Sequence, residues 1–169
     1  MSVLYPVLGA VALARLAELY HAGRNTRALL AQGGVEFGRR QYPLIVAFHA
    51  AWLLAMLVFV QADRYPDWDW LILFAALFAL RIWVIASLGR FWTTRIVSLP
   101  GTPLVRRGPY RLVRHPNYLV VALEIPVLPL AFGAWRIALG FGLVNLALLA
   151  WRIRTEDRAL APRRAFRPH

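Results

Sequence analysis

Long apolar runs alternate with shorter polar connections along the whole chain. A run of roughly 20 apolar residues is long enough to cross the hydrocarbon core of a bilayer as a helix. Such runs recur here, and they predict spans at residues 3–21, 43–62, 68–88, 117–132 and 134–160. The pattern therefore predicts an all-α fold, namely a polytopic integral membrane protein with about five transmembrane helices.

The ends of these spans carry their own signals. Pro43 opens the second span, where the missing backbone N–H of proline does no harm. Trp68 and Trp70 open the third span in the position of an interfacial aromatic belt. The fourth span is expected to be short and broken by Pro126 and Pro129. The last two turns of the fifth, RIRTEDRAL, are expected to project beyond the hydrocarbon.

The charge of the chain follows the same alternation. The formal net charge is +12 and every basic residue is an arginine. Arginines gather in the connections 23–42 and 89–116 and in the tail from 152, whereas the other two connections hold only Arg64 and Arg136. By the positive-inside rule, the arginine-rich side is cytoplasmic and the N-terminus lies outside. Basic residues that follow loops in this way favour lipid headgroups as partners and argue against nucleic acid.

Composition narrows the chemistry further. The chain has no cysteine, which excludes disulfides, thiolate metal sites and cysteine nucleophiles, and no metal is expected. No basic region precedes the first apolar run, so that run is interpreted as a retained span rather than a cleaved signal. The length of 169 residues fits one domain, with three spans in 1–88, a core in 89–160 and a short basic tail in 161–169.

Several polar residues stand inside the predicted spans. Arg15 and Glu18 are three residues apart, so they share a helix face and either form an ion pair or line a cleft. Arg81 has no acidic residue within a helical turn and needs a partner on another helix. Glu124, a lone carboxylate, is costly unless it is paired or protonated, which leaves a functional or an inter-helix role open. His49 is either packed with a hydrogen bond or part of a substrate site.

Two further polar clusters lie at the ends of the last two spans. One is GPYRLVRHPNYLVV, residues 108–121, and the other is Arg152 to Asp157, in which Arg152 and Glu156 share a helix face. A short turn near Gly133 joins the two spans into a hairpin, which brings both clusters to one membrane face. The expected pocket suits a water-soluble cofactor that meets a lipid-soluble substrate. Its predicted residues are Tyr110, Arg114, His115, Asn117, Tyr118, Arg152, Glu156 and Asp157.

These two clusters resemble one known family. The pattern G-x-Y-x-x-x-R-H-P-x-Y, followed by Arg152-x-x-x-Glu156-Asp157, resembles the isoprenylcysteine carboxyl methyltransferase family over residues 89–160. Its members are integral membrane enzymes that use S-adenosylmethionine. The first two spans and Glu124 look more like the bacterial members that O-methylate phenolic lipids such as alkylpyrones. The resemblance thus implies a bacterial inner-membrane methyltransferase with a lipophilic acceptor.

The resemblance also implies residue roles. Glu156 is implied to bind the cofactor, Arg152 to lie near the reacting group, and Arg152, Glu124 and His49 are assigned to the substrate. The tail APRRAFRPH lacks the family's tyrosine-rich segment, which argues against prenylcysteine, although a phenolic lipid and an isoprenylcysteine carboxylate both stay open as acceptors. The other implied cofactor contacts are Thr102, Pro103, Leu104, Val105, Tyr110, His115, Pro116, Asn117 and Tyr118.

Methyl transfer from a sulfonium is an in-line displacement for which the protein mainly supplies positioning. Arg152 is expected to hold the nucleophilic oxygen, and Glu156 the hydroxyls or ammonium of the cofactor. His115 or Tyr118 is expected to contact the cofactor, with a base role for His115 secondary. Two other functions compete: an NADPH-dependent reductase similar to sterol reductases, for which the chain looks short, and a non-enzymatic lipid-binding protein, which does not explain the converging polar residues.

Overall fold

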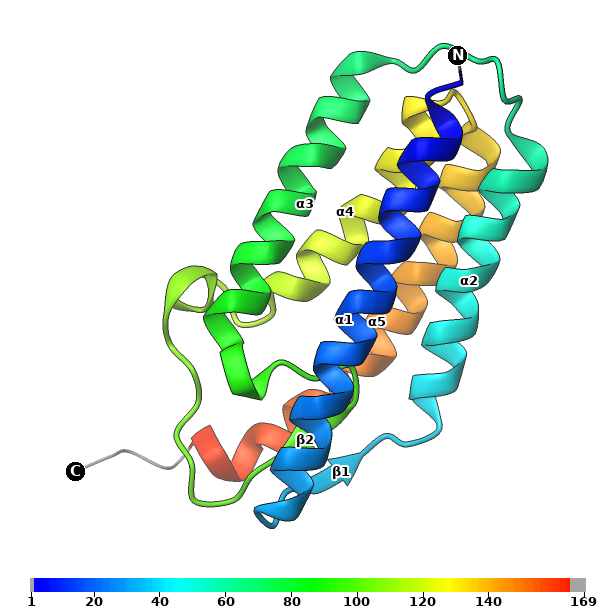
Figure 1. The fold of residues 1–169 in the computed structure, drawn as a ribbon. Helices are drawn as coiled ribbons and strands as arrows, with labels where there is room; N and C mark the ends of the chain where they lie inside the picture. The colour runs from blue at the N-terminus through cyan, green and yellow to red at the C-terminus, as the bar shows by residue number, and fades with distance from the viewer. Residues whose placement is uncertain (1, 165–169) are drawn as a thin grey trace.

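A computed structural model of the protein describes residues 2–164. They form five long α-helices that stand side by side in a bundle (Figure 1). The predicted all-α polytopic membrane protein is thereby confirmed. The long helices are α1 (Leu4–Ala31), α2 (Gln41–Phe59), α3 (Trp68–Leu88), α4 (Pro116–Ala131) and α5 (Trp135–Arg164).

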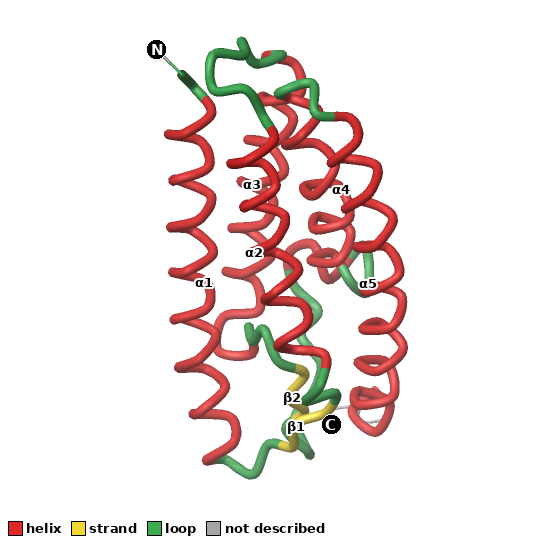
Figure 2. Tube along the Cα trace, turned by 90° about the vertical axis from the view of Figure 1, so that its right-hand side faces the viewer, coloured by secondary structure: helices red, strands yellow, loops and turns green. Residues whose placement is uncertain are grey.

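The five helices differ in how well they suit a bilayer. By length and apolar composition, α2, the segment Trp68–Phe91 and α5 are able to cross a membrane, whereas α4 is a shorter apolar helix of 16 residues. α1 is not in this class, yet it runs the full height of the bundle beside the others (Figure 2). Its 28 residues extend well past the predicted end at residue 21.

The prediction that prolines break the fourth span is wrong. α4 is continuous from Pro116 to Ala131 with Pro126 and Pro129 inside it. Pro129 has no N–H, so it leaves the carbonyl of Ile125 without its helical donor. The buried indole of Trp52, on α2, donates to this carbonyl at 3.1 Å. A neighbouring helix therefore supplies the missing hydrogen bond, which is how a membrane helix tolerates proline.

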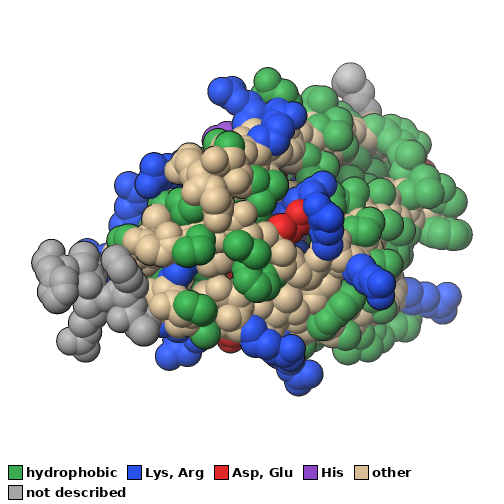
Figure 3. Space-filling view, turned by 90° about the horizontal axis from the view of Figure 1, so that it is seen from below, with side chains coloured by type: hydrophobic (Ala, Val, Ile, Leu, Met, Phe, Trp, Pro, Cys, Tyr) green, Lys and Arg blue, Asp and Glu red, His purple; other side chains and the backbone are tan. Residues whose placement is uncertain are grey.

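The arginine-rich connections meet in a small sheet that the all-α prediction did not contain. β1 (Val35–Phe37) pairs antiparallel with β2 (Ile96–Ser98), with Glu36 opposite Val97. This pairing joins connection 23–42 to connection 89–116 at the end of the bundle where α5 also finishes (Figure 1). Figure 3, a view of this end, shows arginine side chains spread around it with acidic side chains between them.

Two short 3-10 helices complete the second of these connections, η1 (Gly89–Phe91) and η2 (Gly108–Arg111). Apart from β2, the rest of this connection is irregular. α5 continues to Arg164, so the first four residues of the predicted tail 161–169 are helical, and residues 165–169 lie outside the described residues. The hydrophobic core lies around α4, which packs between α3 and α5, and includes the buried Met56, Ile125, Leu128 and Phe132.

Candidate functional site

Four charged side chains from three helices form one connected cluster, here called the charge tetrad: Arg15, Glu18, Arg81 and Glu124. Arg81 donates from Nε and Nη2 to the two carboxylate oxygens of Glu18, at 2.7 and 2.6 Å. Its Nη1 donates to Glu124 at 3.2 Å. Arg15 donates to both Glu18 and Glu124 at 3.0 Å. Each arginine thus bridges both carboxylates, and the Arg81–Glu18 contact is of the bidentate kind that gives strong ion pairs.

The tetrad answers three questions that the sequence left open. Arg15 and Glu18 do form an ion pair, and Arg81 finds its partners on α1 and α4. Glu124, only 2% exposed, is paired between helices. Two arginines and two glutamates give no formal net charge, which is the arrangement that makes ionised groups tolerable inside a membrane protein.

A cavity of about 480 Å³ runs between the helices beside the tetrad. Its volume lies in the range of about 300–1,000 Å³ that is usual for small-molecule sites. Arg15, Glu18 and Arg81 line it, together with His49. Most of the remaining wall on this side is aliphatic or aromatic, with contributions from Ala12, Leu16, Leu19, Val46, Phe48, Leu53, Val121, Leu148 and Leu149.

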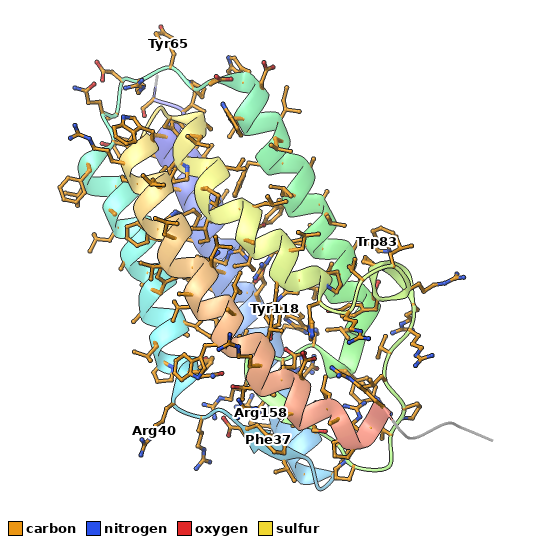
Figure 4. All side chains as sticks on the ribbon, turned by 180° about the vertical axis from the view of Figure 1, so that it is seen from behind. Phe37, Arg40, Tyr65, Trp83, Tyr118 and Arg158 are labelled. Carbon is orange, nitrogen blue, oxygen red and sulfur yellow. The ribbon has the colours of Figure 1, made fainter. Side chains whose placement is uncertain are left out.

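The other end of the cavity carries the hairpin cluster: Tyr110, His115, Tyr118, Arg152 and Glu156, all of which line it. The Tyr118 hydroxyl donates to Glu156 and accepts from Nε of Arg152 at 3.0 Å. Arg152 is buried, and its Nη2 donates to the Thr94 carbonyl at 2.6 Å. Figure 4 shows Tyr118 where α4 begins, close to α5. The two ends of the helical hairpin therefore meet around one guanidinium.

His115 and Tyr110 occupy the sides of this cluster. Nε2 of His115 lies 3.1 Å from Asp157, and Nδ1 lies 4.0 Å from Glu156. The ring stacks on Tyr118 with 5.4 Å between centroids. Burial, and then the nearby Glu156 carboxylate, raises the pKa of the Tyr110 hydroxyl. Tyr110 therefore stays a neutral phenol at physiological pH.

The remaining predicted residues divide into two groups. Leu104, Val105 and Asn117 line the cavity, as do Arg114 and His49. Thr102, Pro103, Pro116 and Glu124 are absent from the described lining. Glu124 stands behind Arg15 and Arg81, with which it is bonded. The assigned roles of all these residues stay predictions, because their positions alone do not test them.

One residue of the site was missed because it looked like part of a basic tail. Arg163 is 7% exposed, lines the cavity and donates to the carbonyls of Thr102 and Pro103, at 2.9 Å each. Its guanidinium also lies 5.5 Å from the centre of the Phe91 ring. Arg163 thus anchors the segment 102–105 to the last turn of α5. Only the continuation of α5 past residue 160 would have indicated this role.

A second contact that the sequence did not predict holds the beginning of connection 89–116. Nδ2 of Asn25, on α1, donates to the carbonyls of Gly89 at 3.0 Å and Trp92 at 2.8 Å. A single amide nitrogen with two protons satisfies two carbonyls of the turn that follows α3. Asn25 carried no sequence signal, since an asparagine near a helix end is common.

The acceptors and ring faces at the hairpin cluster define the ligand that would fit. Glu156 offers a carboxylate, and the buried Oδ1 of Asn117 has no hydrogen-bond partner among the described residues. Tyr118 and His115 offer ring faces, and Leu104 and Val105 an apolar wall. Such a set suits a ligand with hydroxyl or ammonium donors, a flat ring and a positive charge. Within residues 2–164, no group of three histidine or acidic side chains is placed to hold a metal ion.

Comparison with known proteins bears on the same region. The model of the isoprenylcysteine carboxyl methyltransferase (ICMT) family matches residues 70–162. The chain is 39% identical over 150 residues to the uncharacterized protein YpbQ of Bacillus subtilis, covering 86% of this chain and 89% of that protein. It is 29% identical over 143 residues to an uncharacterized protein of Haemophilus influenzae, covering 82% and 83%. No solved structure matches the chain.

Proposed function

The chain belongs to the isoprenylcysteine carboxyl methyltransferase family, a family of membrane methyltransferases, and on that premise we propose that it methylates an oxygen of a lipophilic acceptor with S-adenosylmethionine as the donor. One observation carries the proposal. A single cavity has the hairpin cluster at one end and a largely apolar wall from α1 and α2 at the other. A polar cofactor and a greasy acceptor can therefore meet in the same space.

The residues of the hairpin cluster suit this donor. The carboxylate of Glu156 would accept hydrogen bonds from ribose hydroxyls or the ammonium group, and the free Oδ1 of Asn117 would accept another. The rings of Tyr118 and His115 would lie against a positively charged sulfur. Leu104 and Val105, held in place through Arg163, would cover the adenine. When bound, the donor supplies an electrophilic methyl group on a sulfonium.

Arg152 would act on the acceptor. Two of its nitrogens are fixed by Tyr118 and Thr94, so the guanidinium is held rigidly on the cavity wall. A fixed positive charge favours the anionic form of an acceptor oxygen and orients it for in-line attack. Because the cavity wall is largely apolar, the loss of charge on oxygen and sulfur during transfer would be opposed less than in bulk solvent.

The proposal includes a location. The positive-inside rule would put the arginine-rich end, with the hairpin cluster, at the cytoplasmic face. This is the side on which a water-soluble cofactor is made. Both relatives come from bacteria, which favours the bacterial inner membrane.

The test is incubation of the purified protein, in lipid nanodiscs, with methyl-labelled S-adenosylmethionine and a bacterial lipid extract. Label in an acid-stable methyl ether would identify a phenolic or enolic acceptor, and label in a methyl ester would identify a carboxylate. Calorimetry would measure cofactor binding separately. Absence of both binding and labelled lipid would refute the proposal, and lipid reduction with NADPH would favour the reductase alternative.

Substitution of Arg152 sharpens this test. Arg152→Ala is expected to lower turnover by about 100-fold or more, the usual cost of a lost group that stabilises charge, while some cofactor binding remains. Arg154, exposed on the same helix, provides a matched control, and Arg154→Ala should leave activity unchanged. Near-normal turnover in Arg152→Ala would contradict the role given to this residue.

A further inference from the structure

His49 lines the cavity, and one of its two ring nitrogens is hydrogen-bonded within α2. Nδ1 lies 2.8 Å from the carbonyl of Ile45, one turn earlier in α2. A carbonyl can only accept, so Nδ1 carries the proton of the neutral ring. Nε2 then holds a lone pair, and no hydrogen bond to it is found among residues 2–164. The fold therefore leaves an unoccupied proton acceptor on the cavity wall.

The charged groups around His49 are paired with one another. The titratable groups on the same wall are Arg15 and Glu18 of α1 and Arg81 of α3, with Glu124 of α4 behind them. All four belong to the charge tetrad, whose formal charges cancel. α5 faces this level with Asn145 and leucines. Every nearby carboxylate is bonded to an arginine and can only accept, so none of them donates a hydrogen bond to Nε2.

His49 also lies within reach of the hairpin cluster. Gln41 donates to Thr155 at 2.8 Å, so the first residue of α2 and Thr155 of α5 stand at one level. His49 is eight residues further along α2, and Arg152 three residues earlier on α5, in helices that run in opposite directions (Figure 1). With a rise of about 1.5 Å per residue, their Cα atoms differ in level by about 7–8 Å.

We propose that His49 is the catalytic base of the reaction: its Nε2 removes the proton from the acceptor hydroxyl whose oxygen Arg152 positions. This inference rests on the proposed function. The O–H bond breaks and its proton goes to Nε2, while the oxygen forms a bond to the methyl carbon as the sulfur–methyl bond breaks. The products are a methyl ether, a neutral thioether and a protonated His49, which returns its proton to water through the cavity mouth.

The placement of His49 identifies the class of acceptor. A carboxylate needs no base, and it would present lone pairs to the lone pair of Nε2. A phenol or an enol presents the hydrogen that Nε2 lacks. His115 is not equivalent, because its Nε2 already contacts Asp157 and its Nδ1 is directed to Glu156. His49, Arg15 and Glu18 come before residues 70–162, the region that matches the family model. These three residues beside the proposed acceptor therefore lie outside the part of the chain that the family model describes.

The first experiment needs no turnover. A nitrophenol that bears an alkyl chain is bound to the cofactor-free protein in nanodiscs, and the visible absorbance of its phenolate reports how much is ionised. The wild-type protein is expected to ionise more of the bound probe than free micelles do at the same pH. His49→Phe, which keeps a ring of similar size beside Phe48, should abolish the increase. His49→Gln should still bind the probe, because the amide accepts a hydrogen bond, but should not ionise it.

The second experiment varies the acidity of the acceptor during methyl transfer. With a weakly acidic phenol, His49→Gln is expected to be about 100- to 10,000-fold slower, the usual contribution of a general base. With a nitrophenol that is already ionised at the assay pH, the variant should approach the wild-type rate. His21, an exposed histidine of α1, is the matched control, and His21→Gln should behave as wild type with both acceptors.

The results of these experiments distinguish the role of His49 from the proposed methyl transfer. Equal loss with both acceptors, together with unchanged ionisation of the bound probe, would overturn the role of His49 while leaving methyl transfer intact. Methylation of carboxylates but of no phenol by the wild-type protein would overturn it as well. Failure of the wild-type protein to transfer methyl to any acceptor would instead refute the proposed function.

Discussion

The charge tetrad makes a sharp prediction about stability. Arg81→Met removes the cation that touches both carboxylates and leaves Glu18 and Glu124 to share Arg15. Methionine fills much of the same volume, so the change acts mainly on charge. The largely buried site then carries an excess negative charge that is poorly screened. We expect the variant to be strongly destabilised.

The structure gives the size of the effect. At the 3.2 Å that separates Arg81 from Glu124, Coulomb's law with an effective dielectric constant of about 20 gives about 5 kcal/mol for one pair of unit charges. The contact to Glu18 at 2.6 Å adds to this, and the desolvation of Arg81, which is 6% exposed, offsets part of the sum. Removal of one partner of a buried pair usually costs about 3–5 kcal/mol, and we expect that amount here.

A double substitution separates charge balance from lost packing. Arg81→Met with Glu124→Leu removes one charge of each sign and leaves Arg15 paired with Glu18 at 3.0 Å. A neutral site with well-packed apolar replacements is often as stable as the original ion pair. The double variant is therefore expected to be more stable than either single variant, which is the opposite of additive behaviour.

Stability can be measured by denaturant unfolding in detergent micelles, followed by the fluorescence of the seven tryptophans. Arg95→Met is the matched control, because Arg95 is partly exposed and pairs with Glu36 at 3.3 Å. Such a pair contributes about 0–1 kcal/mol. The reasoning fails if Arg81→Met lowers the free energy of unfolding no more than Arg95→Met does, or if the double variant is less stable than both singles.

Two further substitutions test contacts that hold the site. Trp52→Phe removes the donor to the Ile125 carbonyl. It should lower the free energy of unfolding by about 1–3 kcal/mol in the same assay. An effect smaller than that of Arg95→Met would count against this hydrogen bond. Arg163→Gln releases the carbonyls of Thr102 and Pro103, so it should weaken S-adenosylmethionine binding measured by calorimetry more than it lowers turnover at saturating cofactor; a loss confined to turnover would contradict an anchoring role.

The features that the sequence predicted well are those set by local patterns. Apolar length placed the helices, and the alternation of arginines placed three segments at one end, where the β1–β2 pairing joins two of them. The spacing of Arg15 and Glu18 predicted their contact, because residues three apart in a helix are neighbours. The hairpin of α4 and α5 brings His115 and Asp157 within 3.1 Å, as antiparallel neighbours joined by a short turn must.

The features that it did not predict depend on which faces of distant helices meet. Arg81 needed a partner, but nothing in its own segment distinguishes Glu18 from the other acidic residues of the chain. The prolines of α4 suggested a break because the donor that repairs the helix, Trp52, belongs to another span. The short strands β1 and β2 are three residues each, too short for any alternation to stand out.

The tetrad connects the two halves of the cavity, and this explains why charges stand in the middle of an apolar bundle. η2, α4 and α5 carry the hairpin cluster, whereas α1 and α2 supply most of the acceptor wall. Apolar packing between membrane helices is weakly directional, since lipid tails compete equally well for an apolar face. A bidentate ion pair is directional, so Arg81 fixes the register of α1 against α3 while a cavity is left open between the helices. The ion pairs of the tetrad hold Glu18 on Arg81, and Nε2 of His49 is left without a hydrogen bond among the described residues. The proposed removal of a proton from the acceptor hydroxyl depends on this unoccupied nitrogen.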